Sequence, residues 1–205
     1  MRLLFVRHGE SEANVARVFA NRGWSHPLTD KGRRQALALV QTLADRELAA
    51  IYSSPLQRAV ETGQIIAQPR GLPVEIEPAL IEYHVGIYEG RPLDQNGAIQ
   101  RYNEVAQKWT GGDFSARLPD GESGHDIRAR FIPFFNRLRD RHQESNATIL
   151  LVGHGGTFTH ALPMILPNLS CAMTLATGLD NCSFAEACLQ NGDFRCIRWG
   201  AITFD

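Results

Sequence analysis

The chain has 205 residues, of which 43% are hydrophobic and 21% are charged, an ordinary composition for a globular protein. This length favours a single domain over residues 1–205, with a core large enough to need neither disulfides nor a structural metal. Lys and Arg number 21 against 22 Asp and Glu, giving a net charge of −1, and no basic stripe indicates a nucleic-acid partner. No apolar run reaches the roughly 20 residues that a membrane-spanning helix needs.

The first predicted element is a strand over Arg2–Arg7. Its apolar run, Leu3–Val6, begins at once and leads directly into Arg7-His8-Gly9, so we expect no signal peptide and a cytoplasmic location. Thr29 is then expected to cap a helix that extends to about Asp45, because apolar side chains recur there at helical spacing.

A short buried strand is predicted at Ala49–Ser53. The four residues after it indicate the start of a helix, with Ser54 as the cap, Pro55 at the first helical position and Gln57 completing a capping box. Another short strand is expected at Pro73–Ile76.

The pattern weakens between Glu82 and about Asp120, where glycines interrupt the chain. We interpret residues 83–120 as a lid inserted into the domain, with a helix over Asp94–Trp109. A long helix over Glu122–Gln143 is expected to follow.

The C-terminal part holds one more predicted helix, which starts at Gly156 and is disturbed at Pro163. The remaining strands are Thr148–Val152, Cys182–Leu189 and Phe194–Trp199. The last two flank Gln190-Asn191-Gly192-Asp193, whose Asn-Gly pair is a hairpin signal. Strands that alternate with helices predict an α/β fold, a three-layer α/β/α sandwich whose mainly parallel central sheet has an antiparallel edge.

All four cysteines lie near the C-terminus and show no CxxC spacing. We expect them to be small buried apolar residues, with a disulfide or a zinc site as the weaker alternative. The four are Cys171, Cys182, Cys188 and Cys196.

Two segments resemble each other, Leu3–Gly9 and Ile149–Gly155, because each is an apolar strand that ends in x-His-Gly. In a parallel sheet His8 and His154 would both emerge at the carboxyl edge, where ligands bind. Helix N-termini beyond the two turns would favour an anion. One histidine at a strand end is more often a simple hydrogen-bonded residue, but two at equivalent positions indicate a site.

Two arginines are expected at the same edge, Arg7 and Arg58. Guanidinium groups match phosphate oxygens bidentately, so this combination suits a phosphoryl group. Arg58 alone would be taken for a surface helix residue, whereas Arg7 ends an apolar strand and needs water or a partner. Nearby arginines also lower the pKa of a histidine and favour the neutral form that a nucleophile needs. No serine elbow, Walker loop, GxGxxG or HExxH motif offers competing chemistry.

The proton donor must be a carboxylate or another histidine. Glu82 lies just past a strand, but the pattern alone does not rank it above other candidates. The alternatives are Glu10, Glu61 and Glu89 among the carboxylates and His26, His84 and His125 among the histidines, although these histidines fit solvent-facing loops better.

Five sequence blocks occur in order between residue 2 and about residue 160. They are Leu4–Ser11 with Asn14, Pro27–Gly32, Tyr52–Thr62, Leu80–Gly90 and Val152–Gly155. Together they resemble the histidine phosphatase superfamily, also called the phosphoglycerate mutase-like family.

The resemblance implies that His8 is the nucleophile that becomes phosphohistidine and that Glu82 is the proton donor to the leaving oxygen. It also implies a phosphate pocket formed by Arg7, Asn14, Arg58, His154 and the backbone amide of Gly155. It implies chemistry without a metal or another cofactor, on a small phosphorylated metabolite; a homodimer is one possible assembly.

Several positions depart from the family pattern. Ile81 and Tyr88 stand where the family usually has Arg and Trp, and a Thr that contacts the substrate carboxylate in mutases is replaced near Ala20 or Asn21. The lid also lacks the Arg-containing run that mutases close over their substrate. We therefore predict a phosphomonoester phosphatase. A phosphoglycerate mutase-type isomerase and a non-catalytic phospholigand-binding module are the alternatives.

Overall fold

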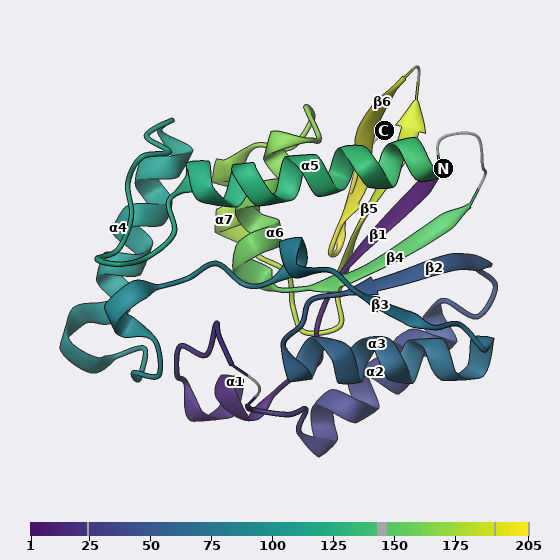
Figure 1. Ribbon diagram of the computed structural model, residues 1–205, viewed down its shortest axis with the longest axis horizontal. Helices are drawn as coiled ribbons and strands as arrows, with labels where there is room; N and C mark the ends of the chain where they lie inside the picture. Colours follow the sequence, from purple (N-terminus) through teal and green to yellow (C-terminus); the bar gives the residue numbers. More distant parts are fainter. Residues whose placement is uncertain (24, 143–146, 191, 205) are drawn as a thin grey trace.

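The computed structural model of the protein describes residues 1–23, 25–142, 147–190 and 192–204. Within these residues seven strands form one sheet in the order β3-β2-β4-β1-β5-β6-β7 (Figure 1). The strands are β1 (Arg2–Arg7), β2 (Leu48–Ser53), β3 (Val74–Ile76), β4 (Thr148–Gly153), β5 (Phe184–Gln190), β6 (Asp193–Trp199) and β7 (Ile202–Thr203). The four strands β1, β2, β3 and β4 pair with one another in parallel, whereas β5, β6 and β7 add antiparallel pairs at one side of the sheet. The predicted parallel sheet with an antiparallel edge is confirmed.

Helices cover both faces of this sheet. They are α1 (Glu12–Ala16), α2 (Asp30–Thr42), α3 (Gln57–Ala67), α4 (Ala98–Thr110), α5 (Gly124–His142), α6 (Gly155–Ala161) and α7 (Cys171–Thr177). Figure 1 shows α2 and α3 on one side of the sheet and α5, α6 and α7 on the other. The predicted α/β/α layering is therefore confirmed.

The apolar sequence of β1 follows from its position between two helical layers. Leu4 and Val6 pack in the hydrophobic cluster under α2 and α3, whereas Leu3 and Phe5 pack in the cluster under α5 and α6. All four side chains are fully buried, as is typical of parallel strands with both faces covered. The strand thus delivers His8 to the carboxyl edge of the sheet.

Two predicted helix starts had different outcomes. Thr29 caps α2 as expected, since its hydroxyl accepts from the backbone N–H of Gly32 at 3.0 Å, although α2 ends at Thr42. The capping box predicted at Ser54 is wrong, because α3 begins only at Gln57. The Gln57 amide donates to a glutamate one turn on, and the Ser54 hydroxyl lies 2.7 Å from a ring nitrogen of His154. The site thus uses the hydroxyl that the sequence assigned to the cap.

Residues 83–120, the predicted lid, pack against the core as a wall of the molecule. Its helix α4 starts at Ala98, after a short 3₁₀ turn at Gln95–Gly97. Its side chains Tyr83, Tyr88 and Trp109 are buried in the hydrophobic cluster that also contains the α5 side of the sheet. The segment is therefore held by the core.

The later elements lie close to their predicted positions. α5 begins at Gly124, two residues after the predicted start, and the predicted end at Gln143 lies outside the described residues. α6 gives way at Pro163 to a 3₁₀ turn, as expected. β5 and β6 pair antiparallel, while Asn191 of the predicted hairpin turn lies outside the described residues.

The four cysteines are free thiols; Cys196 is buried in the core and the other three are partly buried. Among the described residues, no group of three His, Cys, Asp or Glu side chains is arranged to hold a metal ion. A search of the same residues finds no helix with the length and apolarity needed to cross a bilayer.

Candidate active site

The candidate active site lies where the carboxyl ends of β1 and β4 meet. Because Arg7 pairs with Gly153 across these parallel strands, His8 and His154 leave them at the same edge, with ring centroids 5.1 Å apart. A pocket of about 320 Å³ opens there. Six of the seven predicted site residues line it: Arg7, His8, Asn14, Arg58, Glu82 and Gly155.

Two hydrogen bonds fix the tautomer of His8. Its Nδ1 lies 2.7 Å from the carbonyl of Gly9, which can only accept, so Nδ1 carries the proton. Its Nε2 accepts from Nε of Arg58 at 3.0 Å, and an arginine can only donate. The ring is 3% exposed, and this burial, together with Arg58 and Arg7, holds the pKa of His8 well below its usual value. At neutral pH, His8 is therefore a neutral imidazole with its lone pair on Nε2.

The two arginines supply the positive charge of the pocket. Burial lowers the pKa of Arg58 to about 10, so its guanidinium stays protonated at neutral pH. Arg7 donates through Nη1 to the carbonyl of Leu179 at 2.6 Å, and its buried Nε has no acceptor among the described residues. The backbone N–H of Gly155, the first of α6, also lacks an acceptor in the described part of the chain. These donors suit an anion.

His154 lies behind the pocket and has no exposed surface. Its Nδ1 is 3.4 Å from Nη2 of Arg58, and its Nε2 is 2.7 Å from the hydroxyl of Ser54. Because Arg58 can only donate, Nδ1 is the acceptor and Nε2–H donates to Ser54. Burial, with Arg58 and His8 adding to it, lowers the pKa of His154 well below its usual value. Before any ligand binds, His154 orients Arg58.

Asn14 presents its amide group at the pocket rim. Its Oδ1 accepts from the backbone N–H and the hydroxyl of Ser11 at 3.0 and 3.1 Å, which starts the short helix α1. Asn181 adds a donor to the same oxygen at 3.4 Å and a second bond to the carbonyl of His8 at 3.0 Å. With Oδ1 occupied, the NH₂ group of Asn14 is the part that can contact a ligand.

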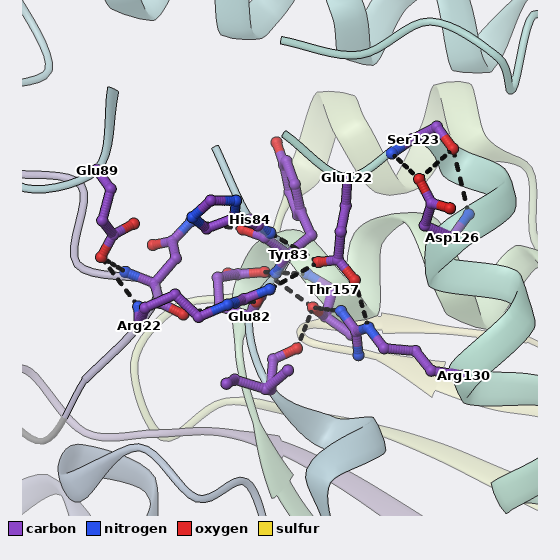
Figure 2. Close-up of polar contacts among 12 residues, drawn as sticks. Arg22, Glu82, Tyr83, His84, Glu89, Glu122, Ser123, Asp126, Arg130 and Thr157 are labelled. Atoms are coloured by element: carbon purple, nitrogen blue, oxygen red, sulfur yellow. Dashed lines mark hydrogen bonds and ion pairs between the residues drawn. The ribbon is translucent and has the colours of Figure 1, made fainter. Parts of the chain in front are cut away.

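Glu82 is held by the N-terminus of α6, as Figure 2 shows for its contact with Thr157. Its Oε1 accepts from the backbone N–H groups of Tyr83 and Thr157 at 3.0 and 2.6 Å, and the Thr157 hydroxyl lies 2.9 Å away. Its Oε2 accepts from the N–H of Gly156 at 2.9 Å. A Cβ at position 156 would come within 2.8 Å of this carboxylate, so only glycine permits the close approach.

The rival acid candidates lie elsewhere. Glu10 pairs with Lys31 and Thr29, Glu61 accepts from the backbone N–H of Leu28, and Glu89 accepts from two backbone N–H groups. The histidines proposed as alternatives, His26, His84 and His125, do not line the pocket either. Glu82 is the one carboxylate among the described residues that lines it.

A partly buried carboxylate fastens the lid beside Glu82. Glu122 accepts from Arg22 at 3.1 Å, from Arg130 at 2.9 Å and from the backbone N–H of His84 at 2.7 Å (Figure 2). Arg22 in turn donates to the carbonyl of Glu82. This network joins the residues on both sides of the lid to α5.

Replacing Glu122 by glutamine should destabilise the fold. Arg22 and Arg130 have side chains only 33% and 18% exposed, and both would lose their counter-charge, at a cost of about 2 kcal/mol after allowance for partial exposure. Thermal unfolding should shift down by roughly 4–8 °C for a chain of this size. Asp140→Asn, which breaks an exposed pair with Arg139, is the control and should cost less than about 0.5 kcal/mol. Equal thermal unfolding midpoints for Glu122→Gln and the parent would contradict a stabilising role for Glu122.

His160 makes the free energy of unfolding depend on pH. The ring lines the pocket, is 1% exposed, and its Nδ1 has no partner among the described residues. Burial lowers its pKa to about 4, below the value near 6.5 expected when unfolded. Because the unfolded chain binds the proton more readily, the free energy of unfolding is unaffected by this group above about pH 6.5 and decreases as the pH falls toward 4. Between pH 7 and pH 5 the decrease is about 2 kcal/mol.

Between pH 7 and pH 5, the free energy of unfolding of the variant His160→Phe should therefore fall by about 2 kcal/mol less than that of the parent. Phenylalanine can keep the edge-on contacts that His160 makes with Trp109 and Tyr83. Urea unfolding at the two pH values measures the difference. Parallel pH profiles for variant and parent would show that His160 does not carry the effect.

Several residues at the site were not predicted to belong to it from the sequence. Ser54 and Thr157 position His154 and Glu82, Asn181 contacts the backbone of His8, and Tyr102 and His160 line the pocket. Each acts on a partner distant in the chain, so local pattern carried no signal for it.

Known proteins resemble this chain over nearly its full length. The family model of the histidine phosphatase superfamily (branch 1) matches residues 3–202. The chain is 31% identical to phosphoserine phosphatase 1 of Hydrogenobacter thermophilus, over 90% of this chain and 85% of that protein. It is 35% identical to a 2,3-bisphosphoglycerate-dependent phosphoglycerate mutase of Bartonella bacilliformis, over 86% of this chain and 88% of the mutase.

Solved structures give the same picture. A mycobacterial glucosyl-3-phosphoglycerate phosphatase, solved in complex with VO3, superposes with a TM-score of 0.82 at 27% identity, covering 98% of this chain and 99% of that one. The α-ribazole phosphatase of Shigella flexneri gives a TM-score of 0.79 at 26% identity, covering 98% and 96%. Because the family model matches nearly the whole chain, the chain belongs to the histidine phosphatase superfamily.

Proposed function

We propose that the protein is a phosphomonoester phosphatase that acts on a small phosphorylated metabolite through a phosphohistidine on His8. The observation that carries the proposal is the tautomer of His8, in which Nδ1–H lies on the carbonyl of Gly9 and the Nε2 lone pair accepts from Arg58. A nucleophilic histidine needs this neutral form and this orientation.

In the first half-reaction Nε2 of His8 attacks phosphorus and the bond from phosphorus to the leaving oxygen breaks. Arg58 now donates to Nε2, and a bound phosphoryl group would draw that donor onto its own oxygens and free the lone pair. Arg7 and the N–H of Gly155 would stabilise the charge on the transferring oxygens. Asn14 would contribute through its NH₂ group.

Glu82 would supply the proton that the leaving oxygen takes up. Oε2 is the better site for this proton, because it accepts from the N–H of Gly156 alone whereas Oε1 accepts from two backbone N–H groups. In the second half-reaction Glu82 would take a proton from water, whose oxygen attacks phosphorus as the bond to Nε2 breaks. Inorganic phosphate and neutral His8 result.

The mutase alternative would require a second substrate hydroxyl, rather than water, to take the phosphoryl group. Relatives of both kinds are known, and the first half-reaction is common to both. The non-catalytic alternative would require the pocket to lack a nucleophile or acid, yet both His8 and Glu82 line it. Hydrolysis is therefore the function that we propose.

The test is release of p-nitrophenol from p-nitrophenyl phosphate by the purified protein, with and without EDTA. We expect turnover in both cases, because none of the proposed steps involves a metal. A parallel assay would follow conversion of 3- to 2-phosphoglycerate primed by the bisphosphate. Isomerisation much faster than phosphate release would support the mutase, and no turnover of any ester would refute an enzymatic role.

The proposal includes a cytoplasmic location and a small-molecule partner. A single domain with residues 83–120 as its lid and a possible homodimer also belong to it. Cell fractionation and sedimentation of the purified chain would test location and assembly separately from activity.

A further inference from the structure

Part of the pocket has apolar walls, and we call this part its apolar end. Phe19 comes from the segment after α1, Leu93 from the lid, Ile99 from the first turn of α4 and Leu175 from α7. Figure 1 shows α4 beside α7, and the four side chains line the same pocket. This end offers burial to an apolar group.

An aromatic surface forms one of these walls. Tyr102 of α4 lies against Phe19 with ring centroids 5.7 Å apart and stacks on Tyr83 at 5.4 Å with an interplanar angle of 21°. A flat wall of this kind packs well against another ring in an offset-stacked or edge-on arrangement.

Few charged groups line the pocket. Among the described residues that line the pocket, the charged side chains are Arg7, Arg58 and Glu82, which are the groups at the phosphoryl position. Arg22 lies beside Glu82, but its Nη1 donates to the carbonyls of Asn21 and Glu82 and its Nη2 to Glu122. Apart from Arg7 and Arg58, a carboxylate on the leaving group would meet no free cation among the described residues that line the pocket, and burying an unpaired charge is costly.

The polar groups at the apolar end are uncharged. His160, with its pKa lowered by burial to about 4, is neutral at pH 7, and burial raises the pKa of Tyr102. The amide of Asn21 is already used on the carbonyl of Tyr83 at 2.8 Å. This end can therefore give a ligand neutral hydrogen bonds at most.

We propose that the preferred substrate is the phosphate monoester of an uncharged alcohol that carries a ring, with the ring against Phe19 and Tyr102. The inference rests on the proposed function and names the substrate class of the same site. A volume of about 320 Å³ is near the lower limit for ligand pockets, so the alcohol has one or two rings. Monoesters with a carboxylate in the leaving group, such as 3-phosphoglycerate and phosphoserine, are disfavoured.

The test compares esters that differ in charge at the apolar end. Phenyl phosphate and 1-naphthyl phosphate carry an uncharged ring, whereas 4-carboxyphenyl phosphate has a better leaving group but adds a carboxylate. We expect kcat/KM for the uncharged esters to be at least about tenfold higher, despite the poorer leaving group, because the carboxylate would be desolvated without a partner. Benzyl phosphate against phosphoserine and 3-phosphoglycerate extends the comparison to alkyl esters.

A cation placed at the apolar end should reverse this preference. Ile99→Arg puts a guanidinium in the pocket and is expected to lower the ratio of kcat/KM for phenyl over 4-carboxyphenyl phosphate by about tenfold. Gln100→Arg is the matched control, because Gln100 is exposed on the same helix and does not line the pocket. For this control, the ratio of kcat/KM for phenyl over 4-carboxyphenyl phosphate should equal that of the parent.

The outcomes separate this inference from the proposed function. If all esters are hydrolysed and kcat/KM for the carboxylated esters equals or exceeds that for the uncharged ones, the proposed substrate class is wrong but the phosphatase activity stands. A ratio unchanged by Ile99→Arg, or changed equally by Gln100→Arg, would also overturn it. No hydrolysis of any ester, with no phosphate on His8, would refute the phosphatase itself.

Discussion

The variant His8→Ala is expected to lose turnover by a factor of about 10⁴ or more on every ester. Alanine removes the ring nitrogen whose lone pair lies beside Arg58, and His154 cannot replace it, since His154 is fully buried and its Nδ1 already accepts from Arg58. Initial rates of phosphate release from p-nitrophenyl phosphate measure the effect.

The matched control is His125→Ala, an exposed histidine of α5 that does not line the pocket, and its rate should stay within about twofold of the parent. Because Arg7 and Arg58 remain in His8→Ala, inorganic phosphate should still raise its unfolding midpoint. Near-normal turnover in His8→Ala would refute the assignment of the nucleophile.

The variant Glu82→Gln should be selectively poor with bad leaving groups. Loss of the proton donor is expected to lower kcat by about 10²–10³ on an alkyl ester such as benzyl phosphate. With p-nitrophenyl phosphate the loss should be much smaller, about tenfold or less, because p-nitrophenolate leaves with little need of a proton. The ratio of the two losses is the measurement.

A second effect of this substitution must be separated from the first. The Gln NH₂ group would face the backbone N–H of Gly156, which now donates to Oε2, and the side chain could shift. A shift alone would slow both esters alike, so equal losses would argue against Glu82 as the acid. Glu61→Gln, outside the pocket, should leave the ratio of the two rates unchanged.

Much of the site could be predicted from the strand ends. The apolar runs before His8 and His154 require two buried strands, and parallel pairing of β1 with β4 brings both histidines to one edge. The placement of Arg7 follows from the same strand. Glu82 could not be ranked by pattern, because its carboxylate is oriented by amides of α6, more than 70 residues later in the chain.

The errors and omissions have a common physical cause. Ser54 has every local feature of a helix cap, yet its hydroxyl is used by His154, about 100 residues away. The short helices α1 and α7 span 5 and 7 residues, too few to show a helical period. The apolar end of the pocket is assembled from segments that approach one another only in the fold.

The most direct test of the account is to trap the phosphoenzyme. The protein would be mixed with a ³²P-labelled monoester for milliseconds, quenched in alkaline detergent and mapped by peptide mass. We expect a label on His8 that is stable to base, labile to acid and chased into inorganic phosphate by unlabelled ester. Turnover with no covalent label, or with the label on His154, would contradict the account.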